Sequence, residues 1–410
     1  MNSRLPRAST ATLVLVHEEV GASPSPVAVS PSVPPPPAPG AVRFAAFNTA
    51  LSRQRPGEMV RLLSDPGWAQ ARAVAEIVQL VRPDVLLLNE VDHDEEGRGL
   101  RFLRENYLER GWNGAGGITF PYSYAAPVNT GVASGEDLNG DGKAVTEPGS
   151  TSYAEDALGF GLFPGQYGMA VLSRYPLAAE RARTFREFRW ADMPGALLPT
   201  VPGTDRPFHS PAALAVARLS SKSHWDLPVD VGGRRPVHLL ASHPTPPAFD
   251  GPERRNVLRN HDEIRFWADY VTPGAADYAY DDEGRRGGLA EGEPFVVAGD
   301  LNADPMRGSG LPGAITRLLS HPRVTDPLPC SQGGRGPRGS ALEASGPGPF
   351  TEDTWNGHLR VDYVLPSREL GVGPRGVFWP AADDPVFRLT GGGIPFPSSD
   401  HRLVWADVLV

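Results

Sequence analysis

The sequence predicts an α/β sandwich, because short apolar runs alternate along the chain with segments whose apolar residues recur at helical spacing. Residues 42–47 and 84–90 have the composition of buried β-strands. Between them, residues 69–81 carry Ile77 and other apolar side chains at helical spacing, and Pro83 ends this pattern. The order strand, helix, strand, helix favours layers of sheet and helix within one fold.

The later part of the chain continues this alternation. Residues 99–110 and 253–270 are expected to form helices. Residues 114–166 are polar and rich in glycine and are expected to be an inserted loop, whereas residues 331–349 are rich in glycine and proline and are expected to be a mobile loop. Further strands are expected at residues 168–173, 214–219, 237–242, 295–298, 361–365 and 403–409.

The first 40 residues differ in composition from the rest of the chain. We expect residues 1–40 to be a disordered N-terminal segment and residues 41–410 to form one domain. Two arginines precede a short apolar region at residues 8–16, as in an export signal. Residues 22–40 are rich in proline, which predicts a semi-rigid extended linker. We therefore expect an exported protein, with a cytoplasmic location as the alternative.

The composition excludes several classes of protein. The formal net charge is −9, so the chain lacks the basic balance of a tight, sequence-independent nucleic-acid binder, although a nuclease that engages DNA weakly is still allowed. The single cysteine, Cys330, excludes an intrachain disulfide and a cysteine-based zinc site. No apolar stretch approaches the roughly 20 residues of a transmembrane segment. No stable protein partner is predicted.

The tetrapeptide Gly-Asp-Leu-Asn at residues 299–302 directly follows the apolar run at residues 295–298. Asp300 and Asn302 are two residues apart, so in an extended chain their side chains point to the same side. Such a pair suits the binding of a hydrolytic water or a hard cation against a phosphate. The alternative is an ordinary turn in which these side chains bind the local backbone.

Other predicted strands also end in polar residues able to serve a phosphoester site: Asn48, Glu90, His243, Asp362, Asp400 and His401. In this order the segments resemble the endonuclease/exonuclease/phosphatase superfamily, which includes DNase I, exonuclease III-like enzymes, inositol polyphosphate 5-phosphatases and bacterial sphingomyelinases. The resemblance extends over residues 42–410. It implies a DNase I-like catalytic domain, built as a four-layer sandwich of two packed mixed β-sheets flanked by helices.

The resemblance also implies a divalent metal site. Glu90 would be the principal carboxylate ligand, with Asn48 beside it, and Asp400 and Asp300 would be further or water-bridged ligands. Carboxylate, carboxamide and water ligands suit Mg²⁺ or Mn²⁺ better than zinc. A cation held in this way would neutralise the phosphate and the leaving oxygen.

The resemblance assigns catalytic roles to five residues. Asp300 would orient or deprotonate the attacking water, and Asn302 would hold this water or a phosphate oxygen. His401 would contact the phosphate, with Asp362 setting its tautomer and charge state. His243 would donate to a non-bridging oxygen as charge develops in the transition state. No covalent nucleophile is required.

Two arginines near the start of the predicted helix at residues 253–270 have a functional and a structural interpretation. Arg254 or Arg255 lies close in sequence to His243 and would contact a substrate phosphate near the helix N-terminus. The alternative is that both arginines belong to a solvated helix face.

The predicted insert contains a second ambiguous motif. Asp137, Asn139 and Asp141 match the opening of a calcium loop, which would add Ca²⁺ to the cofactors. The closing glutamate is absent from the twelfth position, which Pro148 occupies. The alternative is a turn built from aspartate, asparagine and glycine.

Together these features predict a divalent-metal-dependent phosphoester hydrolase of phosphodiesterase or nuclease type, in which a metal-activated water attacks phosphorus. Nucleic acid, a phospholipid and a small organic phosphate are the substrates considered. The alternatives on the same site are a phosphomonoesterase and a phospholipid or sphingolipid phosphodiesterase. An alternative of another class is a non-catalytic, calcium-dependent binding module. The complete set of polar residues from Asn48 to His401 argues against that last alternative.

Overall fold

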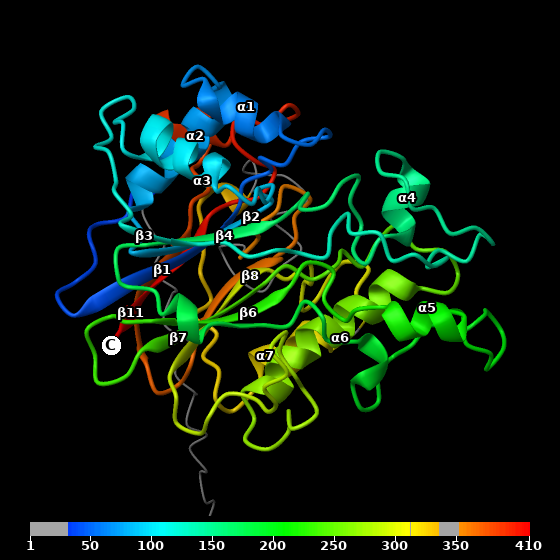
Figure 1. Cartoon of the computed structure of the whole chain (residues 1–410). Coiled ribbons are helices and arrows are strands. Elements are labelled where there is room, and N and C mark those ends of the chain that lie inside the picture. The colour runs from blue at the N-terminus through cyan, green and yellow to red at the C-terminus, as the bar shows by residue number, and fades with distance from the viewer. Residues whose placement is uncertain (1–31, 312, 336–351) are drawn as a thin grey trace, which may run out of the picture.

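Two β-sheets pack face to face in the structure, a computed structural model, and helices cover both outer faces (Figure 1). The structure describes residues 32–311, 313–335 and 352–410. Within these residues one sheet has six strands and the other has five.

The structure describes two of the predicted segments only in part. The predictions for residues 1–31 and for residues 336–349 lie outside the described residues. Residues 32–40, which end the predicted N-terminal segment, are described. There the carbonyl oxygen of Pro35 accepts a hydrogen bond from Arg43 Nη2 at 2.8 Å.

Both sheets are mixed, because β1 pairs in parallel with β2 and β7 pairs in parallel with β8, whereas the other pairs are antiparallel. The first sheet runs β10 (Gly371–Val377), β11 (Val404–Leu409), β1 (Ala41–Asn48), β2 (Val85–Asn89), β4 (Met169–Ser173) and β3 (Tyr122–Tyr124). The second runs β5 (Arg183–Thr184), β6 (His224–Val229), β7 (Val237–Ser242), β8 (Phe295–Asp300) and β9 (Asp362–Pro366).

The longer helices form the two outer layers (Figure 1). The first sheet is covered by α1 (Glu58–Ser64), α2 (Ala69–Val81) and α3 (Arg98–Leu103), which continues as a π-helical turn at Arg104–Leu108. The second sheet is covered by α6 (Arg255–Tyr270) and α7 (Ala314–Leu319), while α4 (Thr151–Asp156) and α5 (Pro211–Val216) lie to one side. In the described part of the chain, no helix has the length and apolar character needed to cross a membrane.

Side chains of the central strands alternate between a core shared by the two sheets and a core beneath the helices. On β1, Phe44 belongs to the core between the sheets and Phe47 to the core under α1, α2 and α3. On β8, Val296 belongs to the core between the sheets and Val297 to the core under α6 and α7. Strands buried on both faces read as continuous apolar runs. The predicted four-layer α/β sandwich is therefore confirmed.

The strand predicted at residues 214–219 is wrong. Pro211–Val216 forms the helix α5, because Ser210 Oγ accepts a hydrogen bond from the Ala213 amide and proline is tolerated in the first helical turn. The strand of this region is β6, and the sequence prediction missed it because Asp226 and Pro228 interrupt its apolar run.

The sequence predicts that residues 114–166 form an inserted loop, but this segment also contains two short elements of secondary structure. It contains the short strand β3, which pairs antiparallel with β4. It also contains the helix α4, whose first turn is capped because Ser150 Oγ accepts a hydrogen bond from the Tyr153 amide. Both elements are too short to produce a periodic sequence pattern. In Figure 1 the segment carrying α4 projects beside α5 and α6.

Candidate active site

The topology brings the predicted site residues to one edge of the sandwich. The parallel strands β1 and β2 end there together, with Asn48 opposite Asn89, and so do the parallel strands β7 and β8. The antiparallel strands β9 and β11 begin at this edge, because Asp362 lies opposite Asp300 and Val404 lies opposite Ala46.

A glycine explains how Asp300 reaches this edge. Gly299 has φ 143°, and a Cβ at this position would lie 2.0 Å from the carbonyl oxygen of Ser242. Only glycine tolerates such a close approach of β7 to β8. The same turn places Asn302 in the left-handed region, with φ 52°, and its backbone amide donates to Asp300 Oδ1 at 2.9 Å.

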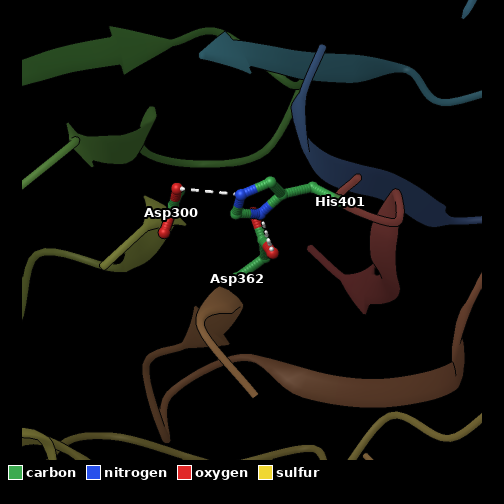
Figure 2. A group of neighbouring side chains, drawn as sticks. All are labelled: Asp300, Asp362 and His401. Carbon is green, nitrogen blue, oxygen red and sulfur yellow. Dashed lines mark hydrogen bonds and ion pairs between the residues drawn. The ribbon is translucent and has the colours of Figure 1, made fainter. Parts of the chain in front are cut away.

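His401 lies between two buried carboxylates (Figure 2). Its Nδ1 lies 2.9 Å from Asp362 Oδ2, and its Nε2 lies 3.7 Å from Asp300 Oδ2. The backbone of this segment is fixed because Ser399 Oγ accepts from the His401 amide and donates to the carbonyl oxygen of Asn48. The His401 ring is therefore held in one orientation by groups from three strands or strand ends.

The charges of this cluster follow from burial and proximity. Burial lowers the pKa of His401, but Asp362 and Asp300 outweigh this effect and raise the pKa to about 10. Burial raises the pKa of Asp362 to about 6, against the effect of His401. Burial also acts to raise the pKa of Asp300, but His401 and His243 hold it well below the usual range. At neutral pH an imidazolium thus sits between two carboxylates.

Asn48 connects this cluster to Glu90. Its Nδ2 donates to Glu90 Oε1 at 3.1 Å and to Asp300 Oδ2 at 3.0 Å, and its Oδ1 accepts from the Ala50 amide at 3.2 Å. Glu90 follows β2 with a left-handed backbone, φ 59°. The structure therefore brings Asn48, Glu90 and Asp300 together, as the sequence predicted they would meet.

Two sets of residues have the donors for a metal ion. Among the described residues, Asp300, Asp362 and His401 form a group of acids and histidines whose donor atoms lie within 4.8 Å of one another. In that group His401 is held protonated, so it is a poor ligand. Glu90 and Asp400 offer carboxylates to the same cavity, and Asp400 Oδ2 accepts from Trp355 Nε1 at 3.0 Å. These hard oxygen donors fit Mg²⁺ or Mn²⁺.

His243 and Asn302 complete the floor of the site. His243 Nε2 lies 3.4 Å from Asp300 Oδ2, and its Nδ1 is buried with no hydrogen-bond partner among the described residues. Burial and the neighbouring Lys222 ammonium lower the pKa of His243, which favours the neutral imidazole. Asn302 Nδ2 donates to the carbonyl oxygen of Pro244 at 3.0 Å, which ties the segment after β7 to the segment after β8.

A cavity of about 770 Å³ opens onto these residues. Its lining includes Glu90, His243, Asp300, Asn302, Asp400 and His401. Arg255 also lines it, but Arg255 Nη1 donates to the carbonyl oxygens of Leu138 and Glu155, at 2.8 and 3.3 Å. Arg254 is exposed at the start of α6 and is not part of the cavity lining. The two predicted phosphate contacts are thus separated, with one in the cavity wall and one outside it.

The predicted calcium motif forms a turn held by its own side chains. The Asp137 carboxylate accepts from the amides of Gly140 and Gly142, at 2.7 and 2.8 Å. Asn139 Oδ1 accepts from the Asp141 amide at 2.9 Å, and Asp141 Oδ1 accepts from the Lys143 amide at 2.9 Å. Contacts of this kind are expected for a turn built from aspartate, asparagine and glycine, which is the alternative to a calcium loop.

Lys222 is a site residue that the sequence prediction missed. It precedes β6, lines the cavity and is only 6% exposed. No hydrogen-bond or ion-pair partner for its ammonium occurs in the described part of the chain. Burial lowers the pKa of Lys222, while Glu263, Glu90 and Asp300 oppose this effect. In the sequence, Lys222 lies in a serine-rich segment directly before β6. Because β6 was not predicted, the position of this lysine near a strand end was not recognised.

Comparison with known proteins gives the family. The Endonuclease/Exonuclease/phosphatase family model matches residues 45–401. No curated protein sequence matches the chain significantly.

Similar solved structures include an endonuclease/exonuclease/phosphatase from Beutenbergia cavernae, with 18% identity over 90% of this chain and 72% of that chain, and a TM-score of 0.46. The human nocturnin catalytic domain has 15% identity over 90% and 93% of the two chains, with a TM-score of 0.44. Sphingomyelinase C from Streptomyces griseocarneus has 15% identity over 90% and 99%, with a TM-score of 0.41. On the family match, the chain belongs to the endonuclease/exonuclease/phosphatase family and is an enzyme that hydrolyses phosphoester bonds.

Proposed function

We propose that the protein is a divalent-metal-dependent phosphodiesterase in which water attacks phosphorus directly. The observation that carries this proposal is the placement of the His401 ring between Asp362 and Asp300, at the floor of the cavity that Glu90 and Lys222 also line. A histidine beside a carboxylate suits the two needs of the reaction, which are to bind an anionic phosphate and to orient the attacking water.

Each group has a role that follows from its charge. Asp300 stays ionised because of its low pKa, so it can accept a hydrogen bond from the attacking water and orient it. His401 donates from Nε2 to a phosphate oxygen, because its Nδ1 is engaged by Asp362. His243, kept neutral, has one N–H to donate, from Nε2 either to Asp300 Oδ2 or to another phosphate oxygen. Asn302 holds the water or a phosphate oxygen. Most of the rate enhancement then comes from positioning and electrostatics.

The metal would be held by Glu90 and Asp400, with Asn48 keeping Glu90 and Asp300 in place through its Nδ2. A bound Mg²⁺ or Mn²⁺ would neutralise the phosphate and the leaving oxygen. Lys222 adds a second positive charge on the same wall of the cavity. The calcium loop at Asp137, Asn139 and Asp141 and the phosphate contacts of Arg254 and Arg255 stay predictions.

Hydrolysis of bis(p-nitrophenyl) phosphate tests the proposal. We expect turnover with Mg²⁺ or Mn²⁺, loss of turnover in EDTA, and recovery when the metal is restored. Glu90→Gln should weaken Mn²⁺ binding in calorimetry by about tenfold or more, since it removes a ligand charge. Glu180→Gln changes an exposed carboxylate away from the cavity and is the matched control. An inert protein, or activity that EDTA leaves unchanged, would favour a binding module over an enzyme.

We also infer export from the short apolar region and the proline-rich segment near the N-terminus. Expression of the full chain with a C-terminal tag, followed by fractionation of cells and medium, tests this inference. Recovery of the tag only inside the cells would favour the cytoplasmic alternative.

A further inference from the structure

Large apolar side chains are exposed around the mouth of the active-site cavity. Phe249 and Phe160 line the cavity, yet they are 93% and 50% exposed, so both lie at its rim. Met306 is 86% exposed and stands between Pro305 and Arg307, and Arg307 also lines the cavity. Isolated exposed apolar residues are common, but a group at the mouth of one catalytic cavity indicates a binding surface.

Hydrogen bonds to the first turn of α6 hold the backbone around Phe249. Its backbone is in the left-handed region, with φ 58°, which costs free energy for a bulky residue. Asn256 Nδ2 donates to the carbonyl oxygen of Ala248 at 2.9 Å on one side of Phe249. On the other side, the Asp250 carboxylate accepts from the amides of Asn256 and Val257, at 2.7 and 2.9 Å. The first turn of α6 thus holds the backbone from which an exposed aromatic ring projects, six residues after His243.

The other two rim residues are also held by their neighbours. Asp304 Oδ1 accepts from the amides of Met306 and Arg307, at 2.8 and 2.7 Å. The residue before Phe160 is anchored because the carbonyl oxygen of Gly159 accepts from the Gly131 amide at 2.8 Å. Three segments from separate parts of the chain therefore present apolar side chains from backbone that hydrogen bonds hold in place, and a backbone ordered in advance loses less entropy on binding.

The cavity behind the rim has an apolar wall that leads to the charged floor. Its lining includes Leu138, Ala154, Leu158, Pro246, Pro247 and Leu359. Its volume of about 770 Å³ lies in the range of small-ligand pockets. The substrate phosphate would therefore be attached to an apolar group, and the net charge of −9 disfavours docking on an anionic polymer or an anionic membrane.

We propose that the rim formed by Phe160, Phe249 and Met306 docks on a zwitterionic lipid surface, and that the substrate is the phosphodiester of a membrane phospholipid. This inference rests on the proposed function and names its substrate class. Three exposed apolar side chains around one cavity mouth favour insertion between lipids. Stacking of a single nucleobase would need one aromatic ring and would leave Met306 without a role.

The test is binding of the full-length chain to phosphatidylcholine vesicles, measured by co-sedimentation. We expect the wild-type protein and Glu90→Gln to bind, and Phe249→Ser to bind about tenfold more weakly, because one buried phenylalanine contributes at least that factor. Ile394→Ser is the matched control, since Ile394 is 89% exposed and does not line the cavity. It should bind within about twofold of the wild type. All the substituted side chains are exposed or polar, and thermal unfolding verifies that each variant is folded.

The outcomes separate this inference from the proposed function. Absence of vesicle binding by a protein that hydrolyses bis(p-nitrophenyl) phosphate would overturn the docking surface alone. Equal losses of vesicle binding in Phe249→Ser and Ile394→Ser would also overturn it. So would a Phe249→Ser variant that keeps vesicle binding and loses only the binding of a single-stranded oligonucleotide. Vesicle binding that depends on Phe249 in a protein without any phosphoesterase activity would keep the surface and overturn the proposed function.

Discussion

His401 Nδ1 lies 2.9 Å from Asp362 Oδ2, and the Asp362 side chain is completely buried. Asp362 begins β9, where its backbone amide donates to Thr354 Oγ1 at 2.9 Å, which holds the backbone of this residue in place. This pairing stabilises the charged form of His401 and aims its Nε2 at Asp300 and the cavity.

Replacing Asp362 by asparagine should lower kcat for bis(p-nitrophenyl) phosphate by about 100-fold, because positioned acid–base groups contribute effects of this size. Asp362 raises the pKa of His401, so its loss lowers that pKa and moves the alkaline limb of the pH–kcat profile to lower pH. Steady-state kinetics across pH measure both effects. Asp205→Asn, at an exposed position, should leave the profile in place. A change confined to KM would contradict the placement of His401 at the transition state.

Replacing Lys222 by methionine should lower kcat/KM for the same diester by about 100-fold, as expected for loss of one charged group facing the phosphate. Methionine has a similar length and is compatible with burial, so the free energy of unfolding should not fall. Lys143→Met changes an exposed lysine and is the control. Unchanged kinetics for Lys222→Met would mean that the buried ammonium serves only to balance Glu263 and Glu90.

The sequence predicted central strands such as β1 and β8 because they are buried on both faces and read as unbroken apolar runs, at residues 42–47 and 295–298. It missed β6, which is equally buried, because Asp226 and Pro228 interrupt the apolar run. It failed at 214–219, where alanine and valine residues suit a strand or a helix equally. The hydrogen bond from the Ala213 amide to Ser210 Oγ decided between them, and a capping contact of this kind is not part of an apolar pattern.

The candidate site was predictable where a residue ends a strand, as for Asn48, Glu90 and Asp300. The contact between Asp362 and His401 was expected only from the family resemblance, because 39 positions separate the two residues in the chain. Lys222 and the exposed Phe249 could not be predicted. Whether such a side chain faces a cavity, a core or solvent depends on packing between segments distant in sequence.

Replacing Gly299 by alanine should lower the free energy of unfolding by about 3 kcal/mol or more, because the backbone is strained for any other residue and a Cβ would overlap a backbone oxygen. That oxygen belongs to Ser242 and would lie 2.0 Å from the added atom. Urea unfolding measures the difference. Gly116→Ala places a Cβ in open space and should change stability by less than about 0.5 kcal/mol. Equal stability of the two variants would show that β7 and β8 separate at no cost.

His224 should make the fold less stable as the pH falls. It is buried, its Nε2 lies 2.9 Å from the carbonyl oxygen of Glu263, and burial lowers its pKa to about 4. The unfolded chain binds a proton below a pKa of about 6.5, whereas the folded chain resists protonation until the pH is near the lower value. Between these values the free energy of unfolding should fall by about 1.4 kcal/mol per pH unit for this residue.

The measurement compares urea unfolding of the wild type and of His224→Gln, which has no ionisable group at this position, from about pH 7 to about pH 4.5. Other buried histidines, such as His209 with a pKa lowered to about 4 by burial, contribute equally to both proteins and cancel in the difference. The slope for His224→Gln should therefore be shallower by about 1.4 kcal/mol per pH unit, whatever its absolute stability. Parallel slopes would mean that His224 is protonated inside the fold, with the Glu263 carbonyl and Ser220 Oγ, 2.5 Å from Nδ1, accepting both ring protons.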